Sequence, residues 1–250
     1  MCFAARNAQA STIAQAELSA SGAPLTLDQG PVVSAVLSKP TTTGGRYIFL
    51  VDDGSGSMDV FGPTASGGAL VGGYVPAAGD GLSISGPFSP FSGVPEMGTP
   101  TAITMNSSGN TVPAPLLETI PTLATYTAAP TAGNPYPSFA GHLVTIENVS
   151  ISSAITGNYG TVNVQSTITD SGTHTLTGFY SPITYTTASD NLSGTPIARS
   201  SVNVTGLVQI FNGAPELLIM SVTPVPEPAT CGLLGLGAVA LLNTRRARKE

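Results

Sequence analysis

Residues 82–97 read LSISGPFSPFSGVPEM, and residues 202–217 read VNVTGLVQIFNGAPEL. The residues that are identical in an ungapped comparison are Gly86, Phe91, Gly93, Pro95 and Glu96 in the first segment and Gly206, Phe211, Gly213, Pro215 and Glu216 in the second. Apolar residues also correspond, because Leu82, Ile84 and Met97 match Val202, Val204 and Leu217. The offset is 120 residues at every one of these positions, which predicts two copies of one domain.

Short apolar runs bounded by turn residues surround both segments, a pattern typical of strands. In the first copy, the Gly-rich turn 52–56 separates runs 46–51 and 57–61, which predicts a β-hairpin. In the second copy, the turn 170–172 separates runs 159–168 and 173–180. Further strands are expected at 32–37, 82–85, 142–151, 201–208 and 216–222. About five strands per copy suit a small closed barrel, so we predict an all-β fold of two tandem barrels, with a β-sandwich as the alternative.

The composition supports a folded body with a separate tail. Hydrophobic residues make up 41% of the chain and charged residues 9%, so the chain can bury a core. We expect residues 1–29 to be an N-terminal segment left over from a signal peptide and leader. Residues 30–106 and 139–223 are then the two barrels, joined by a Pro-, Thr- and Ala-rich linker at 107–138, and residues 224–250 are a sorting tail.

Charge is distributed unevenly along the chain. Four of the eight basic residues lie among the last six residues of the sequence, and the rest of the chain carries four basic against thirteen acidic side chains, a formal charge of −9. Such a body repels phosphate backbones, so we expect no nucleic-acid partner. Cys2 and Cys231 both lie in terminal segments, so the body has no disulfide and must be stabilised by packing.

The C-terminal tail has three consecutive parts. The first is Val225, Pro226, Glu227 and Pro228, where the prolines keep the chain extended. The second is an apolar run at 229–242, expected to form a single transmembrane sorting helix, with its anchor residues Ala229, Leu233, Leu234, Leu236, Val239, Leu241 and Leu242. The third is a basic end, expected to stay in the cytoplasm, made of Arg245, Arg246, Arg248 and Lys249. The apolar run is short against the ~20 residues of a comfortable span, which suits a transient anchor.

This order of parts resembles the PEP-CTERM sorting signal. The resemblance implies export, recognition by an exosortase, which is a membrane protease, and cutting near Pro226–Pro228. The body resembles bacterial OB-fold modules in its order of a hairpin with a D-x-G turn, a long link and an apolar-x-apolar-x-Gly hairpin. Residues 121–151 resemble the entry segment of such modules, in which a short helix precedes the first strand.

The N-terminus has part of an export signal. Ala8, Gln9 and Ala10 resemble an A-x-A cleavage site, although no apolar region of suitable length precedes them. We therefore expect the native reading frame to begin upstream of Met1 and to encode the missing apolar segment.

No group of residues in the body predicts catalysis. Asp52, Asp53 and Asp59, with Asp80 near them in sequence, lack the spacing of a calcium loop, so we interpret this group as hairpin turn residues. His142 and His174 lie in different strands. Glu96 and Glu216 occupy equivalent places in the two copies, so each is expected to serve its own barrel. We expect no enzyme, no cofactor and no metal.

Two functions from different classes remain open. The first is a non-catalytic cell-surface or matrix protein, displayed through its tail, with exopolysaccharide as a candidate partner. It would pass through the inner membrane and finish at the cell surface or in the extracellular matrix. The alternative is an extracellular nucleic-acid-binding OB-fold protein, which the scarcity of basic side chains and the absence of Trp disfavour.

Overall fold

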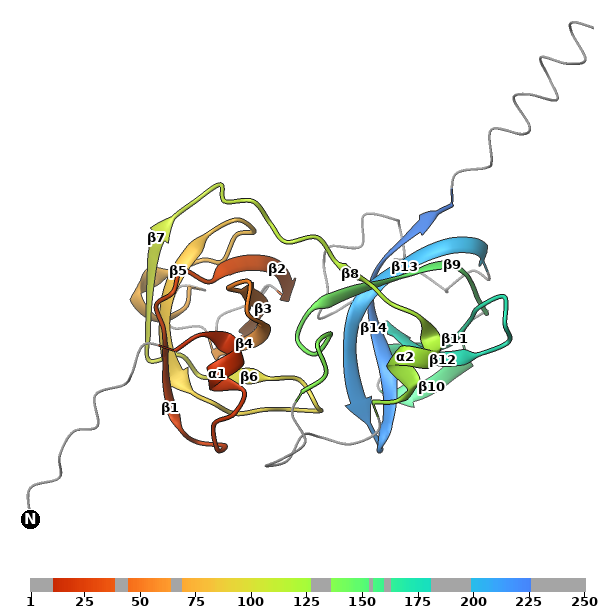
Figure 1. Cartoon of the computed structure of the whole chain (residues 1–250), viewed down its shortest axis with the longest axis horizontal. Coiled ribbons are helices and arrows are strands. Elements are labelled where there is room, and N and C mark those ends of the chain that lie inside the picture. The colour runs from red at the N-terminus through yellow and green to blue at the C-terminus, as the bar shows by residue number, and fades with distance from the viewer. Residues whose placement is uncertain are drawn as a thin grey trace, which may run out of the picture.

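The computed structural model describes residues 11–38, 45–63, 69–126, 136–152, 155–159, 163–180 and 199–225. This part of the chain forms two β units that lie side by side (Figure 1). The first unit contains α1 (Ile13–Ala16), β1 (Pro24–Leu27), β2 (Val32–Ser38), β3 (Arg46–Asp52), β4 (Ser57–Pro63), a 3-10 turn η1 (Val71–Gly73), β5 (Gly81–Pro87), β6 (Glu96–Gly98) and β7 (Ala102–Ser107). The second contains β8 (Leu116–Leu117), α2 (Ile120–Ala124), β9 (Leu143–Ile151), β10 (Ile155–Tyr159), β11 (Asn163–Thr169), β12 (Thr175–Tyr180), β13 (Arg199–Phe211) and β14 (Ala214–Pro224). The all-β prediction is confirmed.

The first sheet curves into a half-barrel with the strand order β1-β5-β2-β3-β4-β6, and β7 also pairs with β5. β4 and β6 run parallel, with Asp59 opposite Glu96. β6, at one edge of the sheet, approaches β5 where Phe88, just after β5, bridges Met97. At the same place the Ser89 amide donates to the Glu96 carbonyl over 2.7 Å. These contacts bring β5 and β6 together on the side opposite β3.

The second sheet closes into a five-stranded barrel. Its order is β10-β11-β12-β14-β13-β9-β8, and β11 also pairs with β9. Ile168 of β11 lies opposite Ile151 of β9, which completes the ring of β9, β11, β12, β14 and β13. β12 and β14 run parallel, as β4 and β6 do in the first unit. The barrel prediction is thus confirmed for the second unit, whereas the first sheet is a half-barrel and the finer assignment to the OB-fold stays a prediction.

The two repeated segments form equivalent hairpins. The Phe88–Met97 bridge of the first unit corresponds to the Val208–Leu217 pair of the second. Both turns have two consecutive residues with positive φ, Ser92 and Gly93 at 49° and 76° and Asn212 and Gly213 at 50° and 77°. This is the geometry of a type I′ turn, whose twist matches that of the flanking strands and which favours Asn-Gly and similar pairs. The repeat therefore encodes one hairpin twice.

The glycine at the fifth position of both repeated segments is required by packing. Gly86 in β5 and Gly206 in β13 lie on equivalent strands. A Cβ at Gly86 would lie 2.9 Å from Met97 Cγ, and one at Gly206 would lie 2.9 Å from Leu217 Cγ. The large apolar side chain of the neighbouring strand fills the space above each glycine, so the small residue and the large one are needed together.

Each unit also begins with a one-turn helix, which corrects two predicted boundaries. Thr12 caps α1 and Thr119 caps α2, and each helix places two side chains in the core of its own unit. Residues 11–29 therefore belong to the first unit instead of being a leader, because apolar side chains of α1 and β1 are buried there. The expected linker at 107–138 is also structured in part, since β8 pairs with β9 and α2 packs into the second core. The polar composition of both segments concealed these few apolar contacts.

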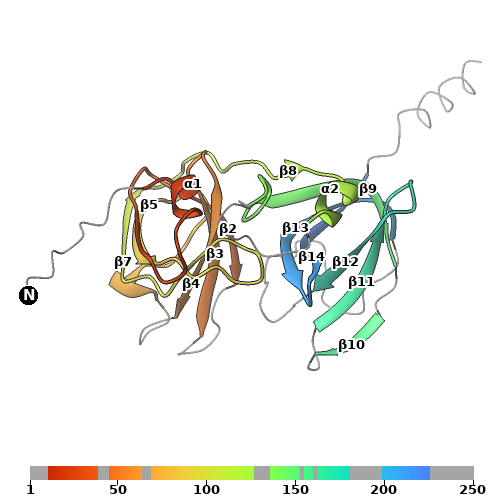
Figure 2. The same ribbon diagram turned by 60° about the horizontal axis from the view of Figure 1, so that its bottom comes forward.

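A third apolar cluster joins the two units, in addition to a core inside each. Its fully buried members are Leu37, Leu50 and Val94 from the first unit and Leu207, Leu218 and Met220 from the second. The tip of the first hairpin extends into the second unit, where the Ser92 carbonyl accepts from the Ile210 amide over 2.6 Å. The Tyr126 hydroxyl donates to the Gly93 carbonyl beside it. Figure 2 shows the same two units side by side from a second direction.

Candidate functional site

The sorting tail begins where the last strand of the second barrel ends. β14 pairs with β13 as far as Pro224, which lies opposite Val202. The Val225 amide then donates to the Ser201 carbonyl over 2.9 Å. Of the predicted tail residues only Pro224 and Val225 are described. Pro226–Pro228, the anchor run at 229–242 and the basic end at 245–249 lie outside the described residues. Across the ranges that are described, no helix combines the length and apolarity needed to cross a bilayer.

A cleft of about 350 Å³ lies between the two units. The outer face of β3 and β4 and the hairpin that follows β5 form one wall, and β13 and β14 form the other. Apolar side chains from both units line most of it. The charged, polar and aromatic residues that line it are Arg46, Asp59, Phe61, Phe91, Glu96 and Gln209. The sequence interpretation did not anticipate this site.

Asp59 and Glu96 form a carboxyl pair in this cleft. They are register partners on the parallel strands β4 and β6, and each is only 8% exposed. Burial, and then the charge of Glu96, raise the pKa of Asp59 well above its usual range. Burial alone raises the pKa of Glu96 to about 7. Ionising both of these neighbouring carboxyl groups would carry a large free-energy cost from charge repulsion and burial. The pair therefore retains at least one proton near neutral pH.

One oxygen of this pair is left without a partner. Asp59 Oδ1 is fully buried and has no hydrogen-bond partner among the described residues. A buried acceptor without a partner costs about 1–3 kcal/mol, more when it is charged. Such a group therefore marks a place where a donor from outside the chain would be bound favourably.

Arg46 and Phe61 lie at one side of the cleft and interact with each other. The Arg46 guanidinium carbon lies 4.6 Å from the centre of the Phe61 ring, which is within the range of a cation–π contact. Within the described ranges no ion pair joins Arg46 to Asp59 or Glu96. The positive charge therefore lies near the carboxyl pair without neutralising it directly.

The two equivalent glutamates differ in their surroundings. Glu96 lines the cleft, as described above. Glu216, 120 residues later, accepts a hydrogen bond from the Gln209 side-chain amide, and burial raises its pKa. Gln209 itself lines the cleft. The second unit therefore contributes the side-chain amide of Gln209 to the cleft, whereas the first contributes the carboxyl of Glu96. The expectation that each glutamate serves only its own barrel is therefore wrong for Glu96, which lies at the junction of the two.

Asp52 and Asp53 act as turn residues, which confirms their interpretation, whereas Asp59 lies inside β4 and lines the cleft, so the turn interpretation is wrong for it. Asp52 Oδ1 accepts from the Gly54 amide over 2.8 Å, and Asp53 Oδ1 accepts from the Ser55 amide over 2.9 Å. Asp53 Oδ2 also accepts from the Ile13 amide over 2.8 Å and so ties α1 to this turn. In the part of the chain that is described, no group of three or more His, Cys, Asp and Glu side chains could hold a metal ion.

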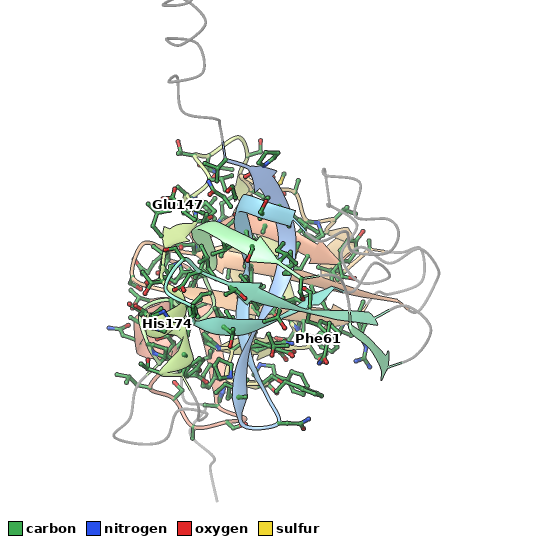
Figure 3. The ribbon with its side chains drawn as sticks, turned by 90° about the vertical axis from the view of Figure 1, so that its right-hand side faces the viewer. Phe61, Glu147 and His174 are labelled. Carbon is green, nitrogen blue, oxygen red and sulfur yellow. The ribbon has the colours of Figure 1, made fainter. Side chains whose placement is uncertain are left out.

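Both histidines contact carboxylates but not each other. His142 Nδ1 lies 3.1 Å from Asp52 Oδ2, which links the start of the second unit to the first hairpin turn. His174 Nδ1 lies 2.9 Å from Asp170 Oδ2 within one exposed turn of the second unit. Figure 3 shows His174 and Glu147 well away from Phe61, so neither belongs to the cleft.

One signal in the sequence could have revealed the carboxyl pair. Asp59 lies between Met58 and Val60 in a short strand whose other residues are almost all buried. A charged residue in the middle of such a strand calls for a partner or a ligand. Its pairing with Glu96 could not be found in this way, because it depends on which strand lies beside β4.

A family model described as the PEP-CTERM protein-sorting motif matches residues 224–249. The comparison with curated proteins finds no match. Among solved structures, "Structural mimicry for functional antagonism" aligns with 10% identity and a TM-score of 0.40 over 79% of this chain and 88% of that chain. "Structure of murine DNA binding protein bound with ds DNA" aligns with 14% identity and a TM-score of 0.41 over 82% and 97%. These structural likenesses are too weak to carry an argument. In its tail, over residues 224–249, the chain is thus similar to exported proteins that exosortases process.

Proposed function

We propose that this protein is sorted through its tail, cut near Pro226–Pro228, and released to serve outside the cell as a non-catalytic binding or structural module. The observation that carries the proposal is the match of residues 224–249 to the PEP-CTERM motif. The three parts of the tail support it, because extended prolines, a short apolar run and a basic end occur in the order that a transient anchor requires.

The position of the motif relative to the fold also supports removal of the tail. The matched region begins at Pro224, the last residue of β14. The last buried side chain before it is Val222. Cutting after Val225 would therefore leave the described cores and strand pairs intact, and the body would remain folded after release.

The proposed role of the body is to bind or build matrix material, with exopolysaccharide as a candidate partner. A formal charge of −9 outside the basic end disfavours polyanionic partners. The described histidines are held by Asp52 and Asp170 instead of facing the cleft, which favours a binding role over catalysis.

The sorting step can be tested by mass spectrometry of the mature C-terminus in a host that has an exosortase and in the same host without it. We expect a mature end near Pro226–Pro228 only when the exosortase is present. Replacing Glu227 with Ala should abolish the cut, whereas Glu147→Ala, which changes an exposed acid in β9, should leave it unchanged. A mature protein that still ends at Glu250 in the exosortase host would refute the proposal.

A further inference from the structure

The cleft between the two units has acceptors for hydrogen bonds but few donors. Asp59 Oδ1 is buried without a partner among the described residues, and the neighbouring Glu96 carboxyl lines the same cleft. Gln209 directs one amide N–H toward Glu216, which leaves its second N–H and its amide oxygen for the cleft. A ligand that satisfies these groups must itself carry several N–H or O–H donors.

The charge of these groups favours a cationic ligand. The ionisable groups that face the carboxyl pair are Arg46 on β3 and, behind Gln209, Glu216 on β14. With both cleft carboxylates ionised, acidic groups outnumber Arg46, and a cation between Asp59 and Glu96 would relieve their mutual repulsion. A metal ion is a poor match, because no group of three or more His, Cys, Asp and Glu side chains that could hold one occurs within the described ranges.

The walls of the cleft favour an organic ion over a bare one. Apolar side chains dominate the lining, and Phe61 and Phe91 present aromatic rings beside the carboxyl pair. Arg46 already lies over the Phe61 ring, so the aromatic and apolar walls serve to bind the hydrocarbon part of a ligand. A primary ammonium offers three donors in a small volume, which suits the acceptors that the cleft provides.

We propose that the cleft between the two units binds an organic ammonium ion, with its nitrogen between Asp59 and Glu96 and its apolar part against Phe61 and Phe91. Two sources share this chemistry, an alkylamine such as a lysine-like chain and a protonated amino sugar. The proposal does not depend on sorting, because it concerns the body alone.

Binding should be measured on the full chain by NMR titration or calorimetry, with n-butylamine and glucosamine as probes. The neutral controls are n-butanol and glucose, which replace the ammonium of each probe by a hydroxyl of similar size and so lose the positive charge. We expect each amine to bind at least about tenfold more tightly than its neutral control. The amine that binds more tightly identifies the source, while equal binding of amines and neutral controls would overturn the proposal.

Charge-removing variants locate the site. Asp59→Asn and Glu96→Gln keep the side-chain shapes and should each weaken n-butylamine binding at least about tenfold. The matched control, Glu147→Gln, removes an exposed acid elsewhere and should leave the affinity unchanged. Arg46→Gln should strengthen amine binding, because it removes a competing positive charge, whereas a site for neutral sugars would lose affinity. Unchanged binding in both cleft variants would refute the assignment.

The pH dependence provides a readout that a structural role would not produce. n-Butylamine stays charged from pH about 6 to about 8, since alkylammonium groups of the lysine type titrate near 10.4. The carboxyl pair must lose its retained proton to receive the cation, so affinity should rise about tenfold over this range. Affinity that falls or stays constant with rising pH would contradict the proposal, and the circular dichroism spectrum of each variant verifies that it is folded.

Discussion

Replacing Glu96 with Gln should stabilise the protein at neutral and alkaline pH but not in acid. Glu96 is buried beside Asp59, and its pKa in the folded chain is about 7 against an ordinary value of 4.5. Between these two values the folded protein retains a proton that the unfolded chain has released. Stability is therefore greatest below pH 4.5 and declines as the pH rises through 7. Glutamine has nearly the same shape and stays neutral throughout, so it removes this decline.

The size of the effect follows from the shift in pKa. A change from 4.5 to about 7 corresponds to at most about 3.4 kcal/mol at 1.36 kcal/mol per pH unit. Water that enters the cleft screens part of this, so we expect the variant to be more stable than the native protein by about 1–2 kcal/mol at pH about 8. At pH about 4.5 the two proteins should be equally stable within about 0.5 kcal/mol.

The measurement is urea unfolding of the full chain, followed by circular dichroism, at several pH values between about 4.5 and about 8. The stability of both proteins should also depend on pH through Glu17, because burial raises the pKa of Glu17 to about 7. The informative quantity is therefore the difference in unfolding free energy between the variant and the native protein at each pH. Glu147→Gln, in an exposed position, should run parallel to the native curve. Parallel curves for Glu96→Gln, or a variant that is less stable at pH about 8, would refute the reasoning.

Two further predictions concern how the units pack. Gly93→Ala should destabilise the protein by more than Gly213→Ala, as measured by urea unfolding. Both glycines have positive φ, which costs alanine about 1 kcal/mol, but a Cβ at Gly93 would lie 2.7 Å from Ile210 Cδ1 whereas one at Gly213 meets nothing within 4 Å. Equal losses would mean that the first hairpin does not dock against the second unit. Leu218→Ala should cost about 2–5 kcal/mol by opening a cavity between the units, and the control Leu117→Ala, which is 68% exposed, should cost less than about 0.5 kcal/mol.

Local patterns in the sequence were sufficient to predict the strands, the hairpins and the sorting motif of the tail. The alternation of apolar residues and the turn at Asp52–Gly56 predicted the β3–β4 hairpin, because strand periodicity and turn chemistry act between near neighbours. The 120-residue repeat predicted two copies of one domain, and the hairpins formed by the two repeated segments agree in register. The tail motif is recognisable because its three parts are consecutive in the chain.

The sequence was less informative wherever a residue depends on a distant partner. The N-terminal segment looked like a leader because Ile13 and Leu25 find their apolar contacts in strands that come later in the chain. The expected linker was assigned from its Pro-, Thr- and Ala-rich composition, whereas its apolar side chains Ile120 and Leu123 are buried against strands of the second barrel that come later in the chain. The composition of a segment does not show which of its few apolar side chains are buried, because burial depends on the contacts that each side chain makes in the fold.

By itself, then, the sequence determined that the chain is all-β, built from a repeated unit, and equipped with a sorting tail, since each of these is written in near-neighbour patterns. Only the tertiary structure decided that the two units dock through a shared apolar cluster and that Asp59 and Glu96 meet in the cleft beside it. The physical reason is that parallel pairing of β4 with β6 joins residues 37 positions apart, and docking joins surfaces more than 100 positions apart. No local periodicity specifies such contacts, because they are chosen by the free energy of the whole fold.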